Sequence, residues 1–124
     1  MNEPLHGVVV CHGEVAAAMV EAAEEISGIR GALIPVSNRG CGRDLLEERI
    51  VGAVARRPSV VFIDMPSGSC LFAAMKRLRG IPEVAVVTGV NLAMLLDFLF
   101  HRDQPAAGAA ARAVETGAKA MGTR

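Results

Sequence analysis

Four short runs of apolar residues, rich in valine and isoleucine, dominate the hydrophobic pattern of the chain. They cover residues 5–11, 32–36, 59–64 and 83–88. Each run is too short for a typical helix and is apolar at consecutive positions, which is typical of strands buried on both faces of a parallel sheet. We therefore predict four β-strands.

Between these runs the apolar residues recur at helical spacing, with charged residues on the opposite side. Gly28 should end the first helix, which starts at about Glu14, and Asn91 should cap the fourth. Gly117 should end the last helix, so residues 118–122 are predicted to form either a short antiparallel edge strand or a frayed helix end. The predicted helices cover residues 14–27, 45–54, 69–78, 91–100 and 106–115.

The regular alternation of strands and helices predicts an α/β fold in one domain, residues 1–124. Right-handed crossovers place helices on both faces of an open, mainly parallel four-stranded sheet. The expected strand order is 2-1-3-4, with strands one and three side by side. In such sheets ligands bind beyond the carboxyl ends of the strands, where the strand order reverses.

Composition narrows the possible partners. The chain has 13 basic and 13 acidic residues, and only 3% of its 124 residues are aromatic. It therefore lacks the net positive charge and the stacking platforms of nucleic-acid-binding proteins. The apolar stretch at residues 92–100 is too short to span a bilayer, so no membrane insertion is expected. No signal peptide is recognisable, and an odd number of cysteines, three, leaves one over however they are paired, as is usual in a reducing compartment. Both observations predict a cytoplasmic location.

Two polar residues that suit phosphoryl chemistry follow the first and third predicted strands. His12 follows Cys11, and Asp64 ends the third apolar run. Because these strands should be neighbours, we expect the two side chains to meet. An imidazole can attack a phosphoryl group while a carboxylate holds the proton of its other nitrogen. The alternatives are an exposed loop histidine and an ordinary turn carboxylate.

A short loop after the third strand leads into a helix and is a candidate phosphate site. It contains Ser67, Gly68 and Ser69, and Gly13 follows the candidate histidine. Free N–H groups at a helix N-terminus favour phosphate oxygens, and glycine permits a close approach. The alternative is a plain strand-to-helix turn with Ser69 as the N-cap. Both interpretations can hold for one loop.

Five short segments form an ordered pattern along nearly the whole chain. They are Val9-Val10-Cys11-His12-Gly13, the helix end Glu25-Ile26-Ser27-Gly28, Phe62-Ile63-Asp64-Met65-Pro66-Ser67-Gly68-Ser69, Val87-Thr88-Gly89-Val90-Asn91-Leu92-Ala93-Met94-Leu95 and Ala113-Val114-Glu115-Thr116-Gly117. Each segment is short, but their order and spacing together are fairly specific. The pattern is similar to the IIA domain of the mannose/fructose/sorbose class of the bacterial sugar phosphotransferase system.

The resemblance implies that His12 accepts a phosphoryl group from the phosphocarrier protein HPr and passes it to a histidine of a IIB domain. Asp64 would be the carboxylate partner of that histidine. The family usually forms a homodimer by exchanging a C-terminal edge strand, here residues 118–122, and the IIB domain is expected on a separate chain. Two departures are Ser67-Gly68-Ser69-Cys70 in place of Gly-Gly-Ser-Pro, and Ala93 in place of the usual proline.

Other interpretations stay open at this point. A response-regulator receiver would need acidic residues after the first strand, where this chain has Cys11 and His12. A zinc site formed by Cys11, His12, Cys41 and Cys70 is disfavoured because neighbouring strand residues point to opposite faces. We therefore expect no resident metal and no cofactor. A regulatory module of the same fold, which senses the phosphorylation of a carrier or serves a dihydroxyacetone-kinase system, is the main alternative function.

Overall fold

The computed structural model describes residues 3–124, in which four strands form one parallel sheet. The strand order is β2-β1-β3-β4, so the predicted α/β fold and its 2-1-3-4 order are confirmed. Each strand lies within one residue of its predicted bounds. The strands are β1 (His6–Cys11), β2 (Leu33–Ser37), β3 (Ser59–Ile63) and β4 (Val84–Thr88).

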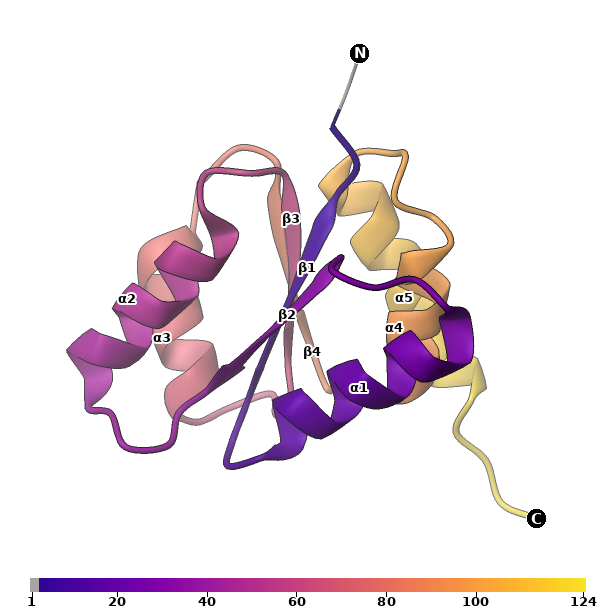
Figure 1. Cartoon of the computed structure of the whole chain (residues 1–124), viewed down its shortest axis with the longest axis horizontal. Coiled ribbons are helices and arrows are strands. Elements are labelled where there is room, and N and C mark those ends of the chain that lie inside the picture. The colour runs from indigo at the N-terminus through magenta and orange to yellow at the C-terminus, as the bar shows by residue number, and fades with distance from the viewer. Residues whose placement is uncertain (1–2) are drawn as a thin grey trace.

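Helices cover both faces of the sheet, which gives three layers (Figure 1). Helices α2 and α3 lie on one face, and α1, α4 and α5 lie on the other. The predicted caps are present: Gly28 ends α1 in a left-handed conformation, and the Asn91 side chain accepts a hydrogen bond from Met94 N. The helices are α1 (Val15–Ser27), α2 (Arg43–Val54), α3 (Ser69–Leu78), α4 (Leu92–Leu99) and α5 (Ala106–Lys119).

Strand register brings the carboxyl ends of the central strands to one edge of the sheet. Val10 of β1 pairs with Val36 on one side and with Ile63 on the other. The residues that follow β1, β2 and β3 therefore emerge side by side. Pro35 lies in β2, an edge strand, where the missing N–H interrupts no second ladder.

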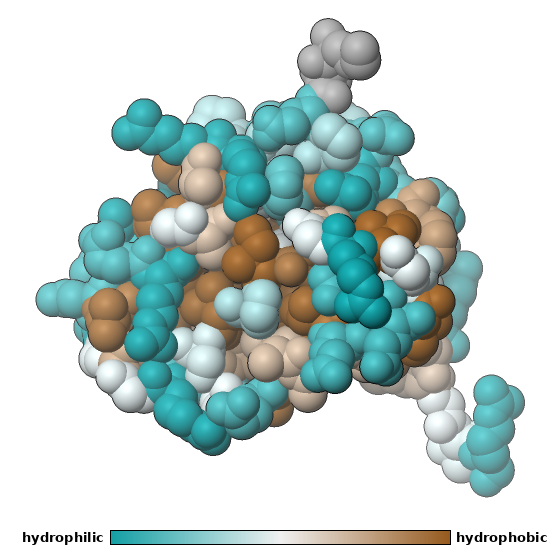
Figure 2. Space-filling model, viewed as in Figure 1, coloured by the Kyte–Doolittle hydropathy of each residue, from teal (hydrophilic) through white to brown (hydrophobic). Residues whose placement is uncertain are grey.

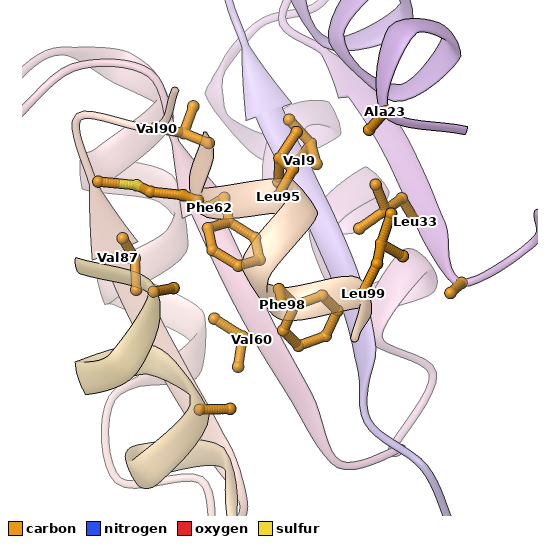
Figure 3. Packing of buried hydrophobic residues seen from close by; sticks show 14 of the residues in the cluster. Val9, Ala23, Leu33, Val60, Phe62, Val87, Val90, Leu95, Phe98 and Leu99 are labelled. Atoms are coloured by element: carbon orange, nitrogen blue, oxygen red, sulfur yellow. The ribbon is translucent and has the colours of Figure 1, made fainter. Parts of the chain in front are cut away.

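Two hydrophobic clusters hold the layers together, one on each face of the sheet. In the larger cluster, Phe62 of β3 meets Phe98 of α4 edge to face, with ring centroids 5.3 Å apart and planes at 75° (Figure 3). Both rings are fully buried, so truncating either to alanine should cost about 3–5 kcal/mol. The smaller cluster joins Val8, Val10, Val61 and Ile63 to α2 and α3.

The C-terminal segment follows the helical alternative of the prediction and not the edge strand, and Gly117 does not end the helix. Helix α5 passes through Gly117 and ends at Lys119, and residues 121–124 form no strand. Gly117 continues the helix because it permits close packing: a Cβ atom there would lie 2.5 Å from Met94 Cγ. Its carbonyl also accepts a hydrogen bond from Asn91 Nδ2 at 3.1 Å. The glycine therefore serves helix packing, and the expected antiparallel edge strand at 118–122 is not formed.

Hydrophobic residues also gather on the surface, over the centre of the face in Figure 2, and hydrophilic residues surround them. In the same view of the ribbon, β2 lies nearest the viewer at this position (Figure 1). Within residues 3–124, no helix has both the length and the apolar character needed to cross a membrane.

Candidate active site

His12 lies immediately after β1 and is fixed by the carboxylate of Asp64, which follows β3. The backbone N–H of His12 donates to Asp64 Oδ2 at 2.8 Å. The ring nitrogen Nδ1 lies 2.8 Å from the same oxygen. The backbone of Asp64 is in turn held by β1, since its N–H donates to the carbonyl of Val10 at 3.3 Å. The structure thus places together the two residues that the strand order predicted to meet.

The Asp64 contact determines which nitrogen of the ring is available for chemistry. A carboxylate can only accept hydrogen bonds, so Nδ1 carries the proton and donates it. In the neutral ring, the lone pair is therefore on Nε2. The His12 side chain is 40% exposed while that of Asp64 is only 15% exposed, so a reactant can approach the ring while its partner stays shielded. This arrangement suits an imidazole nucleophile with a fixed tautomer.

Residues at the end of β2 hold the turn that carries His12. Ser37 Oγ donates to the carbonyl of Gly13 at 2.7 Å, and the N–H of Gly13 donates to Asn38 Oδ1 at 3.1 Å. The sequence pattern did not single out these two residues as part of the site. The available signal was their polar character at the end of a strand that neighbours β1, because the carboxyl ends of parallel neighbours share one edge.

Gly68 brings the start of α3 up to the imidazole ring. A Cβ atom at this position would lie 3.9 Å from both Cε1 and Nε2 of His12. Its backbone has φ 96° and ψ −175°, a conformation that is essentially limited to glycine. Gly68, and not Ser69, is the N-cap, and no side chain among residues 3–124 caps α3. The first N–H groups of the helix are therefore free to bind an anion.

The other predicted phosphate-site residues take different positions. Ser69 is the first residue of α3, so its backbone N–H belongs to the free set at the helix start. The amide of Gly13 is already bonded to Asn38. Ser67 is exposed and lines the groove described below. The main-chain donors nearest the ring thus come from the start of α3.

A carboxylate and a guanidinium lie close to the turn that carries His12. Asp64 Oδ1 is buried and has no hydrogen-bond partner within the described residues 3–124. A Cβ atom at Gly13 would lie 3.2 Å from Arg39 Nη2, so this cation sits against the turn that carries His12. Arg39 Nη1 also pairs with Glu14 at 2.7 Å, an exposed contact of little energetic weight.

The cysteines fall on opposite faces of the sheet. Cys70 Sγ lies 3.9 Å from His12 Nδ1, whereas Cys11 packs in the cluster beneath α1, α4 and α5. Burial, with the nearby Asp64 charge as a further cause, raises the pKa of Cys11 to about 12 and that of Cys70 to about 11. The thiol of Cys41 donates to the carbonyl of Asn38 at 3.1 Å. The four-ligand site of Cys11, His12, Cys41 and Cys70 is therefore not assembled, since Cys11 faces away.

An open groove of about 700 Å³ runs from the Ser67-Gly68 loop along α3. Phe72 forms part of the wall of the groove and is 54% exposed. The guanidinium of Arg43 lies 4.6 Å from the centre of the Phe72 ring. Met65, in the loop before the groove, is also half exposed. The groove is apolar at its base and basic at its far end. Its walls are formed by Ser67, Gly68, Leu71, Phe72, Met75, Lys76 and Arg79.

Comparison with known families decides what kind of protein carries this site. Residues 7–115 match the family model described as the PTS system fructose IIA component. The chain belongs to this family. The match includes β1 from Gly7 onward and all of β2, β3 and β4, together with His12, Asp64 and the start of α3. A comparison of this sequence with curated proteins finds no match.

Solved structures agree with the family at the level of the fold. The phosphotransferase system component EIIA from Streptococcus agalactiae superposes with a TM-score of 0.88 at 14% identity, over 96% of each chain. The mannose/sorbose specific IIA subunit from Enterococcus faecalis gives 0.85 at 20% identity, over 98% of this chain and 96% of that one. A sigma-54 interaction domain protein from Enterococcus faecalis gives 0.79 at 14% identity, over 97% and 95%.

Proposed function

We propose that this chain is a phosphoryl carrier of a sugar phosphotransferase system, with His12 as its phosphorylated residue. The phosphoryl donor is HPr, and the acceptor is a histidine of a IIB domain on a separate chain. Membership of the PTS fructose IIA family supports this class of partner. The observation that carries the proposal is the geometry of His12: Nδ1 is held 2.8 Å from Asp64 while Nε2 faces Gly68 at the start of α3.

In the transfer step, the lone pair of Nε2 attacks the phosphorus atom of the phosphohistidine on HPr. The new N–P bond forms as the old one breaks, and the leaving nitrogen of HPr keeps the electron pair. The His12 ring then carries both the phosphoryl group on Nε2 and a proton on Nδ1, so it gains positive charge. Asp64 stabilises that charge through its 2.8 Å contact with Nδ1. The free N–H groups at Ser69 and Cys70 are positioned to bind phosphoryl oxygens.

The α3 groove is the surface on which we place HPr. It begins at Ser67 and Gly68, beside the ring of His12, so a protein seated there brings its phosphohistidine close to Nε2. Exposed Phe72 and Met65 supply apolar contacts of the kind that protein interfaces bury. A cytoplasmic location fits this partner.

A homodimer is part of the same proposal. Strand β4 is an edge of the sheet, and its residues Val84, Ala85 and Val86 are only partly buried although they are apolar. A second copy of the chain that covers this edge would shield both the apolar side chains and the unpaired backbone groups. Light scattering coupled to size exclusion tests this, because a strictly monomeric mass at micromolar concentration would contradict it.

Phosphorylation of purified protein by phosphorylated HPr tests the main proposal. We expect one acid-labile, base-stable phosphate per chain, located on His12. The variant His12→Ala should take up no label. His6→Ala and His101→Ala are matched controls, because they remove the other two histidines and should leave labelling intact. A label that persists in His12→Ala, or no label in the wild-type chain, would refute the assignment.

A regulatory module is the second candidate function. It is favoured by the fold similarity to the sigma-54 interaction domain protein. In this version His12 is still phosphorylated, but its phosphorylation controls the binding of a kinase or regulator and does not supply a IIB domain. Affinity capture on phosphorylated and unphosphorylated protein separates the two: recovery of a IIB chain favours transport, and recovery of a kinase or regulator without IIB favours regulation.

A further inference from the structure

Three potential metal ligands of different chemistry converge beside the candidate active site. One atom each from His12, Asp64 and Cys70 lies within 4.8 Å of the others. The individual separations are 2.8 Å between Nδ1 and Oδ2 and 3.9 Å between Sγ and Nδ1. Sequence analysis favoured no metal and considered a different set, in which Asp64 had no part.

Two of the three separations are within about 0.5 Å of those that a tetrahedral zinc ion requires. Bonds of about 2.0–2.1 Å to nitrogen and oxygen and about 2.3 Å to sulfur place the ligand atoms about 3.3–3.6 Å apart. Nδ1 and Oδ2 would have to separate by about 0.5 Å, and Sγ would have to approach Nδ1 by about 0.3 Å. The third pair, Sγ and the carboxylate oxygen, lies within 4.8 Å, so a rotation of the Cys70 or Asp64 side chain would have to bring these two atoms closer. His12 is the most exposed of the three, which provides an entry path, whereas Cys70 is fully buried.

Charge also favours a divalent cation at this position. A thiolate and a carboxylate balance the two positive charges, and the imidazole contributes a neutral nitrogen. The buried Oδ1 of Asp64 lacks a hydrogen-bond partner within residues 3–124, so it gains an interaction if a cation enters. The fourth coordination position would be filled by water.

We propose that His12 Nδ1, the Asp64 carboxylate and Cys70 Sγ form an inhibitory site for a divalent cation of the zinc class. When the metal binds, Cys70 releases its thiol proton to solvent. The metal occupies the Nδ1 lone pair, so the single proton of the neutral ring moves to Nε2. A protonated Nε2 has no lone pair for phosphorus. Metal binding and phosphorylation therefore oppose each other, and at equilibrium each weakens the other by the same factor.

The metal site depends only on the side chains, whereas its inhibitory effect rests on the proposed function. Titration of tag-free, reduced protein with cobalt(II) tests the site itself, because a thiolate ligand adds a charge-transfer band in the near ultraviolet. We expect one cobalt per chain, displaced by zinc. Cys70→Ala should lose the band and weaken zinc binding by about 100-fold or more, since even a partner that only orients a ligand is worth about 10–100-fold. Cys41→Ala is the matched control and should keep both properties.

Circular dichroism checks that each variant is folded. If Cys70→Ala is not, Asp64→Asn provides the test, since it should keep the thiolate band but bind zinc more weakly. A wild-type protein without the band, or a band lost in Cys41→Ala and kept in Cys70→Ala, would overturn the site. Zinc should also slow labelling by phosphorylated HPr in the wild type and not in Cys70→Ala. If cobalt binds and labelling is unaffected, the inhibition is refuted. If the chain is never labelled, the proposed function fails, and the cobalt result is unaffected.

Discussion

Substitution of Asp64 by asparagine isolates the charge that supports the His12 imidazole. Asparagine has nearly the same size, and its carbonyl oxygen can accept the two hydrogen bonds that Oδ2 accepts from His12 N and Nδ1. Its amide group would then lie where Oδ1 is buried without a partner within residues 3–124. The substitution therefore keeps the shape of the site and removes its negative charge.

The size of the effect follows from the contact distance. A unit charge on the phosphorylated ring, about 4 Å from the carboxylate charge, interacts by about 4 kcal/mol at an effective dielectric constant of 20. The His12 side chain is 40% exposed, so solvent screening reduces this to about 1.5–3 kcal/mol. Since about 1.4 kcal/mol corresponds to a tenfold change in rate, phosphoryl transfer should slow by about 10- to 100-fold.

Rapid-quench measurement of phosphate transfer from phosphorylated HPr gives this rate directly. Asp103→Asn is the matched control, because Asp103 is exposed and lies in the loop between α4 and α5. A folded Asp64→Asn variant that transfers within about twofold of the wild type would refute the electrostatic role of Asp64.

Three further predictions concern packing, docking and pH. Gly117→Ala should lower the free energy of unfolding in urea by about 1–2 kcal/mol, because the cost of overpacking against Met94 exceeds the gain of about 1 kcal/mol from the higher helix propensity of alanine. Gly108→Ala, in the same helix, is the control and should not destabilise the chain. Equal effects of the two substitutions would contradict the packing argument. Phe72→Ala should raise the KM for phosphorylated HPr about fivefold with kcat and stability nearly unchanged; an unchanged KM would remove HPr from the groove. Burial, assisted by the charges of Arg57 and Arg102, lowers the pKa of His6 below 6.5 in the folded state. The unfolded chain therefore binds the proton first, and the free energy of unfolding should fall as pH drops through 6.5 towards that lower pKa. His6→Gln should reduce this fall, and an unchanged pH dependence would refute it.

Local sequence signals were sufficient for most of the fold. The four apolar runs predicted the strands to within one residue. The central strands β1 and β3 are buried on both faces and are apolar at nearly every position, and the partly buried edge strands β2 and β4 are still marked by consecutive apolar residues. Gly28 and Asn91 were correct as helix ends, since a left-handed C-cap and a side-chain N-cap are set by neighbouring residues. The contact between His12 and Asp64 followed from strand order, which itself reflects the preferred crossover geometry.

The structural features that the sequence did not predict depend on contacts between segments that are distant along the chain. Gly117 carries the local signal of a helix end, and only the proximity of Met94 explains why the helix continues. Ser37 and Asn38 belong to the site because β2 ends beside β1, a relation that single-residue patterns do not express. The same holds for Cys70, whose thiol lies 3.9 Å from His12 Nδ1 because the start of α3 lies beside the imidazole ring.

Because Gly68 has no side chain to cap α3, a phosphoryl group on His12 would act as a reversible N-cap for that helix. A capping side chain is excluded at this position, because the φ of 96° and ψ of −175° at Gly68 are essentially limited to glycine, so the first amides of α3 stay available for the incoming anion. The first turn of α3 should consequently loosen and tighten with each cycle of charging and discharge. Amide exchange at Ser69 and Cys70 would report which form is present, and a binding partner on the α3 groove can sense the same difference.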